Sequence, residues 1–483
     1  MIRPAILLRN MGRIILIIGI SILVCLGWSL AYHEAVTMAI LQAAGLTIGI
    51  GLLLMFVFAG TEGINYKESL ALVSLGWLVV SVFGAFPYIF TGYLPSFADA
   101  WFESVSGFTT TGSSVVADVE AWPKGLMFWR CLTQWLGGMG IIALLVATIA
   151  SIGVRANQLF KAEVPGPISD KISPRIRETA RKLWTAYLLI SVACVLTLFA
   201  LGMDFFDALC HTFATMATGG FSTKNNSIAF YTSPWIQWAL IFFMFVAGSN
   251  FTLHYLAYKK RSLLIYLRNS EFKLYTGIIL SASFLVVLSL TTHGAMMDWE
   301  EKIRAAIFQV VSIITTTGFA TIDYDLWPSL AAMMVFMVMF VGGCAGSTGG
   351  SIKPGRYLII INHSLIELKK MLHPRAVLPL RFGGKVISEN LLFNVLQFFF
   401  LYMVFLALGT IFLTALDIDI ISSLSAAATC LGNIGPGFGL VGPTRNFAFM
   451  PDSGKYILSI LMLVGRLEIY PILLLFLPAF WKE

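Results

Sequence analysis

Four short loops of small residues, each containing one aligned glycine, are the stretches of this sequence best suited to chemistry. They read FTTTGSSV at 108–115, ATGGFST at 217–223, TTTGFAT at 315–321 and LGNIGPGFG at 431–439. Each loop follows one apolar stretch and precedes another. Aligned on Gly112, Gly220, Gly318 and Gly435, the loops lie 108, 98 and 117 residues apart, a spacing typical of one unit present four times.

Loops of this kind between membrane spans predict a pore for cations. Irregular backbone persists at membrane depth only where it is buried in protein or lines a watery cavity. Four such loops around one axis would present rings of carbonyl oxygens, which can replace the water shell of a cation. Glycine allows the backbone angles that turn those oxygens inward. The predicted cation-binding positions are Thr110, Thr111, Gly112, Thr218, Gly219, Gly220, Thr315, Thr316, Thr317, Gly318, Asn433, Ile434 and Gly435.

The composition places these loops in a membrane protein. Of 483 residues, 58% are hydrophobic and only 12% are charged, and the mean hydropathy is +0.84. Apolar runs reach the roughly 20 residues that cross a bilayer. The six cysteines are scattered and show no metal-ligand or redox spacing, so zinc and disulfide roles are not expected.

The distribution of charge predicts the orientation in the membrane. The net charge of +7 could suggest nucleic acid, but the basic residues cluster in connectors between spans. Segments 155–182, 259–273 and 356–389 hold 18 basic residues against six acidic ones, whereas the glycine-bearing segments are acid-rich. By the positive-inside rule, the connectors and both termini are expected in the cytoplasm, and the glycine loops enter from an acid-rich outer mouth. Nucleic-acid binding is not expected.

These features predict an all-α polytopic membrane protein with ten spans and four half-crossing helices around a pseudo-fourfold pore. Two N-terminal spans, 14–30 and 36–59, precede four units of span, short helix, glycine loop and span; the first span is interpreted as an uncleaved signal anchor. The expected divisions are 1–67, 68–155, 183–258, 274–363 and 386–483. The unit spans are expected at 70–90, 126–152, 183–201, 235–257, 274–290, 330–361, 391–416 and 456–480, and the short helices at 96–109, 204–216, 299–314 and 418–430.

The short helices are expected to aim their C-terminal ends at the glycine loops. At 13 to 16 residues they are too short to span a bilayer. Acidic residues lie near the N-termini of all four and complement the positive end of a helix. The negative end would then favour a cation at the loop. These acids are Asp99, Glu103, Asp204, Asp207, Glu300, Glu301, Asp417 and Asp419.

The second spans contain small residues below the loops, and those of the third and fourth units predict a gate. The run from Gly346 to Ser351 cannot hold a helix cheaply, and such a break suits a moving gate. Arg466 lies in an apolar span, so it should face the pore or a buried partner. Either Gly465 brings Glu468 to it, or another carboxylate or loop carbonyls hold it. The predicted gate residues are Gly346, Ser347, Thr348, Gly349, Gly350, Lys353 and Arg466.

The four loops in this order, with QWLGG at 134–138 and GGCAGSTGGSIKPGR at 342–356, resemble the superfamily of potassium transporters that includes TrkH, TrkG and KtrB. The resemblance is greatest to the TrkH branch, which has two extra N-terminal spans. It implies potassium uptake or symport across the bacterial inner membrane, with K⁺ bound in the loops and no organic cofactor. It also implies a homodimer with one pore per subunit, a gating loop at 342–353, an arginine below the filter like Arg466, and separate cytosolic TrkA-like nucleotide-binding subunits.

The sequence departs from a uniform filter and is less consistent with two other classes of function. The second and fourth loops lack the triple threonine, although all four glycines are present, which in this superfamily accompanies potassium preference.

A cation-coupled secondary transporter of another solute would use broken helices, but it predicts an inverted repeat, whereas the loop charges give all units one orientation. An enzyme is not expected, because the six histidines form no catalytic or metal-binding motif.

Overall fold

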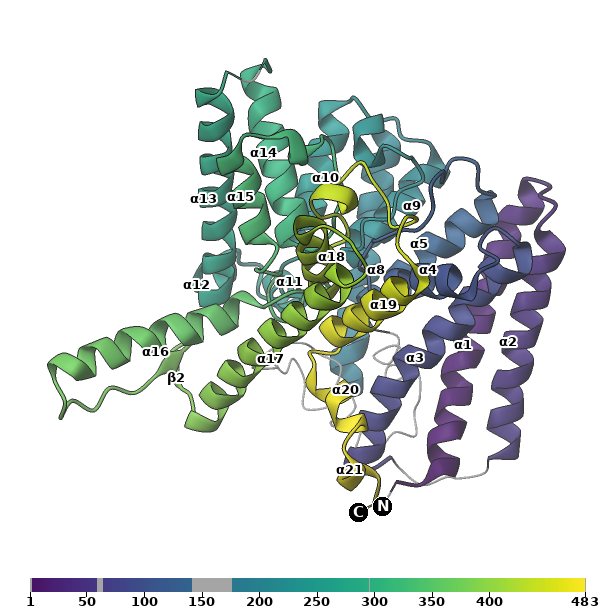
Figure 1. Ribbon diagram of the computed structural model, residues 1–483, viewed down its shortest axis with the longest axis horizontal. Helices are drawn as coiled ribbons and strands as arrows, with labels where there is room; N and C mark the ends of the chain where they lie inside the picture. The colour runs from purple at the N-terminus through teal and green to yellow at the C-terminus, as the bar shows by residue number, and fades with distance from the viewer. Residues whose placement is uncertain (1, 59–63, 141–175, 295, 483) are drawn as a thin grey trace.

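The protein is described by a computed structural model that covers residues 2–58, 64–140, 176–294 and 296–482. It is built almost entirely of helices, as the sequence predicts (Figure 1). The first half of the chain holds α1 Pro4–Ala31, α2 Thr37–Val57, α3 Tyr66–Thr91, α4 Phe97–Phe108, α5 Lys124–Gly138, α8 Ile176–Ala200, α9 Phe205–Ala217, η1 Ser227–Phe230, α10 Pro234–Ala247, α11 Phe251–Lys260 and α12 Leu264–Arg268. The second half holds α13 Ser270–Thr292, α14 Trp299–Ile314, η2 Tyr324–Leu326, α15 Ser329–Val338, α16 Pro354–Leu372, α17 Glu389–Thr414, α18 Ile420–Gly432, η3 Gly439–Val441, α19 Asp452–Arg466, α20 Tyr470–Leu475 and α21 Pro478–Lys482.

Six of the described helices are long and apolar enough to cross a membrane: α1, α2, α3, α8, α13 and α17. They correspond to the two predicted N-terminal spans and to the first span of each unit. The pair α10 and α11 would make a seventh, but the two helices bend by 95° at their junction. The full count of ten spans therefore stays a prediction.

The predicted second spans are not continuous helices. The span predicted at 235–257 is divided into α10 and α11, because Asn250 turns its side chain onto the amide of Thr252 and caps a new helix. The span predicted at 456–480 stops at Arg466, where the two residues Glu468 and Ile469 have positive φ angles of 55° and 69°. The predicted break in the third unit lies between α15 and α16. In the first unit α5 ends at Gly138, and the part of its predicted span from residue 141 onward lies outside the described residues.

The helices pack into two buried cores on opposite sides of the glycine loops. One core joins α1, α3, α4 and α5 to α17, α18 and α19, so the first and fourth units are packed together. The other joins α8, α9 and α10 to α13, α14 and α15 of the second and third units. Burial of apolar side chains in both cores therefore fixes the four loops near one another.

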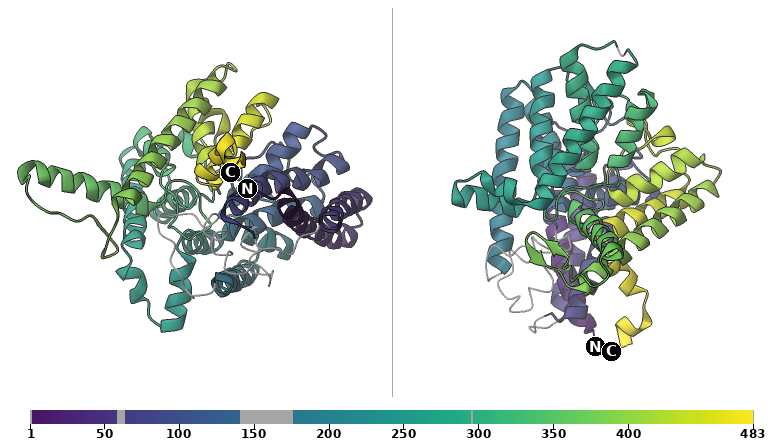
Figure 2. Two further views of the ribbon diagram at one scale, coloured as in Figure 1. Left: turned by 90° about the horizontal axis from the view of Figure 1, so that it is seen from below. Right: turned by 90° about the vertical axis from the view of Figure 1, so that its left-hand side faces the viewer.

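Two local features complete the fold. Glu68 and Asn65 form a capping box at the start of α3, and the same carboxylate pairs with Arg3, which ties the N-terminal segment to the first unit. Helix α16 extends away from the other helices as a long arm, and α17 leads back from it to pack against α18 and α19 (Figures 1 and 2). The antiparallel strands β1 Arg381–Phe382 and β2 Lys385–Val386 lie between them. Helix α1 begins and α21 ends at the same end of the molecule (Figure 1).

Candidate functional site

Each short helix ends at its glycine loop in the same hydrogen-bond pattern. In the first unit, Thr110 N–H donates to Gly107 O at 3.0 Å and Thr111 N–H donates to Ser106 O at 2.9 Å. The other three helices repeat both bonds at the same offsets, which is the Schellman ending of a helix. The residue in the left-handed conformation is normally glycine, but here it is threonine three times and asparagine once. The φ angles are 56° at Thr110, 54° at Thr218, 61° at Thr316 and 54° at Asn433.

This ending has two consequences for the site. The helix carbonyl ends of α4, α9, α14 and α18 all lie at the glycine loops, so their partial negative charges are gathered there. Left-handed backbone is strained for a β-branched residue, and such strain persists only where the surrounding structure enforces it. The loops are therefore held in one shape by their surroundings.

The four loops close into a ring in chain order. The four aligned glycines all have positive φ, between 76° and 102°. A Cβ atom added to any of them would collide with the backbone oxygen of the next loop, at the residue just before that loop's glycine. The separations would be 2.1 Å from Gly112 to Gly219 O, 1.9 Å from Gly220 to Thr317 O, 2.1 Å from Gly318 to Ile434 O and 2.8 Å from Gly435 to Thr111 O. The fourth loop thus returns to the first, and only glycine fits at these positions.

The oxygens that form this ring are available to a ligand, with one exception. In the described part of the chain, the backbone oxygens of Thr111, Thr317 and Ile434 accept no hydrogen bond from the protein. The oxygen of Gly219 accepts one from Gln134 Nε2 at 2.6 Å. Within the same ranges, no group of three or more His, Cys, Asp or Glu side chains is placed to hold a metal ion. The ring can therefore coordinate a cation chiefly through backbone oxygens.

A cavity of about 210 Å³ opens above the ring, and all four glycines line it. The sequence predicts an acid-rich mouth, but the described lining includes the basic residues Arg130, Lys224 and Arg445 and no acidic side chain. Carboxylates lie behind these basic side chains: Lys224 Nζ pairs with Asp207 Oδ2 at 3.3 Å. Arg445 is exposed at the rim, and no acidic partner within the described residues lies against it.

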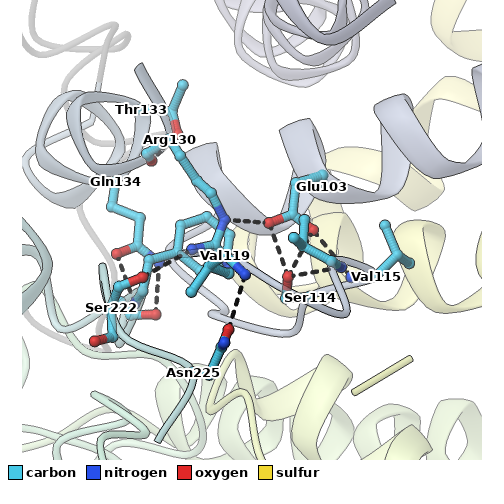
Figure 3. A network of polar contacts seen from close by, with 12 residues as sticks. Glu103, Ser114, Val115, Val119, Arg130, Thr133, Gln134, Ser222 and Asn225 are labelled. Carbon is cyan, nitrogen blue, oxygen red and sulfur yellow. Dashed lines mark hydrogen bonds and ion pairs between the residues drawn. The ribbon is translucent and has the colours of Figure 1, made fainter. Parts of the chain in front are cut away.

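A buried network connects the first loop to the second (Figure 3). Glu103, fully buried, accepts hydrogen bonds from Val115 N at 3.0 Å and from Arg130 Nε. Arg130 also donates to Ser222 O at 3.2 Å and lies 3.7 Å from the ring centre of Phe221. Glu103 lies beyond the first turn of α4, so its predicted role at the helix N-terminus is wrong, and it serves as the counter-ion of Arg130 instead.

The outer face of this region is tied by a second short bridge. Asn225 donates to Asp118 Oδ1 at 2.8 Å and accepts from Val119 N at 2.8 Å. The hydrogen bond from the Asn225 amide lowers the pKa of the Asp118 carboxyl. Asp118 therefore stays ionised at neutral pH and keeps the segments after the first and second loops together.

The loop between α15 and α16 lies against the inner side of the ring. Gly350 N–H donates to Thr316 Oγ1 at 2.7 Å, and Thr218 Oγ1 donates to Thr348 Oγ1 at 3.2 Å. A Cβ atom added to Gly350 would lie 2.4 Å from Gly432 O, so this loop touches the second, third and fourth glycine loops. The remaining predicted gate residues hold the loop's shape: Phe251 N–H donates to Gly346 O at 3.0 Å, and Gly349 N–H donates to Ser347 Oγ at 3.3 Å.

One buried and one half-buried cation, Lys353 and Arg466, complete the inner side. Lys353 is 1% exposed, and its Nζ donates to the backbone oxygens of Gly349 and Gly350. Arg466 donates to Thr348 O at 2.8 Å, and to Gly137 O and Gly138 O at 2.6 and 3.0 Å. The guanidinium thus joins the loop to the end of α5.

Arg466 is bonded to carbonyls, although not to those of the glycine loops, and Glu468 is not its partner. Glu468 pairs with Arg356 at the start of α16. Gly465 serves a different purpose from the predicted distortion, because a Cβ atom there would lie 2.0 Å from Leu431 O. The glycine is therefore needed for close packing of α19 against the end of α18.

Sequence reasoning missed two residues that position the site. Glu271 on α13 accepts hydrogen bonds from Ala345 N and Gly355 N, both at 3.0 Å, and so ties the middle of the loop between α15 and α16 to the start of α16. Its position as an acid amid basic residues of a connector was the available signal. The other is Gln134, whose signal was a polar side chain within an apolar run.

Comparison with known proteins shows extended similarity. Residues 36–483 match the TrkH family, described as cation transport proteins. The Trk system potassium uptake protein TrkH of Escherichia coli is 38% identical over 458 residues, covering 94% of each chain. TrkH of Halomonas elongata is 34% identical over 482 residues, covering 99% of each chain. The crystal structure of the potassium transporter TrkH from Vibrio parahaemolyticus matches with a TM-score of 0.89 at 32% identity and covers 100% of both chains.

Proposed function

Because this chain belongs to the TrkH family of cation transport proteins, we propose that it takes up potassium through the ring of glycine loops, which acts as a selectivity filter. Potassium uptake is the activity named for its relatives. The observation that carries the proposal is the closed contact of each loop's glycine with a backbone oxygen of the next loop. The proposed K⁺ ligands are the backbone oxygens and threonine hydroxyls of 110–112, 218–220, 315–318 and 433–435.

The ion would follow a simple path through this site. A hydrated K⁺ enters the cavity of about 210 Å³, exchanges water for ring oxygens, and is stabilised by the carbonyl ends of four helices. The membrane potential supplies about 2.3 kcal/mol per charge per 100 mV, which supports roughly fiftyfold accumulation. Channel-like uptake is thus energetically sufficient without proton coupling.

The loop between α15 and α16 is the proposed gate. It lies directly below the ring, and Lys353 and Arg466 place two positive charges in the path of a cation. Opening requires this loop and Arg466 to move aside together, because they share the Thr348 O hydrogen bond. No organic cofactor is needed for this mechanism.

We also propose that each chain forms one pore, and we propose its place in the cell and its partners. We place the chain in the bacterial inner membrane with both termini in the cytoplasm and divide it at 1–67, 68–155, 183–258, 274–363 and 386–483. A homodimer and separate cytosolic TrkA-like nucleotide-binding subunits complete the proposed assembly. The basic connectors, which lie on the side opposite the acid-rich loops in this topology, are the surface we propose for the regulatory partner.

Flux through the purified chain tests the function directly. Liposomes containing the protein and loaded with K⁺ should take up radioactive rubidium from outside. External K⁺ should suppress this uptake, and Na⁺ at the same concentration should not. Absence of uptake, or uptake that needs an organic solute, would contradict the proposal and favour a secondary transporter.

Removing the charge of Arg466 should increase basal flux. The Arg466→Gln variant loses a positive charge from the path and hydrogen bonds to Thr348 O and α5. One such barrier of about 1.4 kcal/mol corresponds to a tenfold higher rubidium flux. Arg268→Gln, at an exposed site on α12, is the matched control and should not change the flux. Equal flux in the two variants would remove Arg466 from the proposed gate.

Reversing the charge of Arg445 should speed uptake at low salt. The side chain is exposed at the rim of the outer cavity, so it repels approaching cations. We expect Arg445→Glu to raise initial uptake about threefold near 10 mM ionic strength and to have little effect near 150 mM, where the screening length is about 8 Å. A rate gain that is independent of salt would point to a change in structure instead. Arg445→Gln should give an intermediate rate.

A further inference from the structure

The second glycine loop lacks the internal support that two of the other loops have. In the first loop the hydroxyls of Thr109 and Thr111 lie 2.7 Å apart, and in the third those of Thr315 and Thr317 lie 2.8 Å apart. Each hydroxyl pair is a hydrogen bond within one loop and stabilises the conformation of that loop. The corresponding residues of the second loop are Ala217 and Gly219, which have no hydroxyl.

The missing support is replaced by a side chain from the first unit. Gln134 on α5 is fully buried, and its Nε2 donates to Gly219 O at 2.6 Å while its Oε1 accepts from Phe221 N at 3.1 Å (Figure 3). The two bonds hold the backbone on both sides of Gly220. One carboxamide thus fixes the position of one ring oxygen.

Packing against Gln134 explains why residue 219 is a glycine. Its φ angle is not positive, so the backbone conformation does not require glycine there. A Cβ atom at Gly219 would instead lie 2.5 to 2.8 Å from the carboxamide atoms of Gln134. The glutamine therefore occupies the space that a threonine side chain fills in the first and third loops.

We propose that Gln134 is a selectivity-determining residue, which braces the second loop in place of the hydroxyl pair. This inference rests on the proposed function of the ring as a potassium filter. The amide bonds hold Gly219 O at a fixed distance from the other ring oxygens. When the brace is lost, the ring can relax around a smaller cation, so Gln134 acts on discrimination more than on total flux.

The first test separates the hydrogen bonds from the volume of the side chain. Gln134→Leu keeps most of the volume and removes both bonds, and we expect the preference for K⁺ over Na⁺ to fall about tenfold, the effect of one to two lost buried hydrogen bonds. The readout is the reversal potential in liposomes under opposed K⁺ and Na⁺ gradients. Gln397→Leu, an exposed glutamine on α17, should keep the wild-type reversal potential.

A rescue variant tests the brace itself. The triple variant Gln134→Ala, Ala217→Thr and Gly219→Thr removes the glutamine and gives the second loop the TTTG sequence of the first and third. It should recover at least half of the lost discrimination, whereas Gln134→Ala alone should not. Recovery would support the inference even if Gln134→Leu fails to fold.

The outcomes are distinct. Wild-type selectivity in Gln134→Leu, or a folded triple variant that remains unselective, would overturn the role of Gln134. A wild-type protein without potassium preference would instead overturn the proposed function.

Discussion

Gly318→Ser is expected to abolish most of the preference for K⁺ over Na⁺. Gly318 has a φ of 80°, which is unfavourable for serine by roughly 1 to 2 kcal/mol. Its new Cβ atom would lie 2.1 Å from Ile434 O, so the neighbouring ring oxygen must move. We expect at least about a tenfold loss of discrimination, because 1.4 kcal/mol of differential binding corresponds to that factor. Rubidium uptake into liposomes with sodium competition measures it.

Gly277→Ser provides the control for this substitution. Gly277 lies on α13 with open space around it, so the same change of residue should be tolerated there. If Gly318→Ser kept wild-type discrimination while the protein remained folded, the ring would not be the path of the ion. The same argument applies at the equivalent glycines of the other loops.

Removing residues 346–351 should produce the largest rise in basal flux. The deletion takes away Thr348 and Gly350, whose hydrogen bonds attach the loop to the second and third glycine loops. It also takes away the carbonyls that hold Lys353 and Arg466 across the path. We expect rubidium flux to rise about tenfold or more without any partner protein, since at least one barrier of 1.4 kcal/mol is lost.

Shortening the chain elsewhere provides the comparison. Removal of the two exposed residues Gly383 and Gly384, in the turn between β1 and β2, should leave basal flux at the wild-type level. Unchanged flux after deletion of 346–351, in a protein that still elutes as a folded assembly, would contradict the gate. Higher flux with retained potassium preference would show that the gate and the filter are separate.

The sequence predicted the positions of the short helices well, because their signals are local. The helix predicted at 299–314 is α14 to the residue, and the other three differ by only a few residues at either end. Each helix ends where its periodic pattern of apolar residues gives way to a run of small residues that includes glycine. The threonines in left-handed backbone were not predictable, since helix endings normally place glycine or asparagine there, as only Asn433 does.

The breaks in the second spans and the contacts below the ring depend on tertiary structure. The run at 235–257 is mostly apolar, and only the Gly248–Asn250 step shows that a cap can form within it. The partners of Arg466 lie 118 and more than 300 positions away, so no local pattern could identify them. The role of Gln134 was hidden for the same reason.

The ring is closed by backbone atoms, and this has a consequence for how such a chain can diverge after duplication. At the contacts that close the ring, each loop meets the next through a missing side chain and a carbonyl oxygen. The other residues of TTTG, ATGG, TTTG and GNIG can change during evolution, provided that nearby side chains replace the hydrogen bonds that are lost. Copies of one ancestral segment could thus diverge into four different loops while the pore that they share stays open.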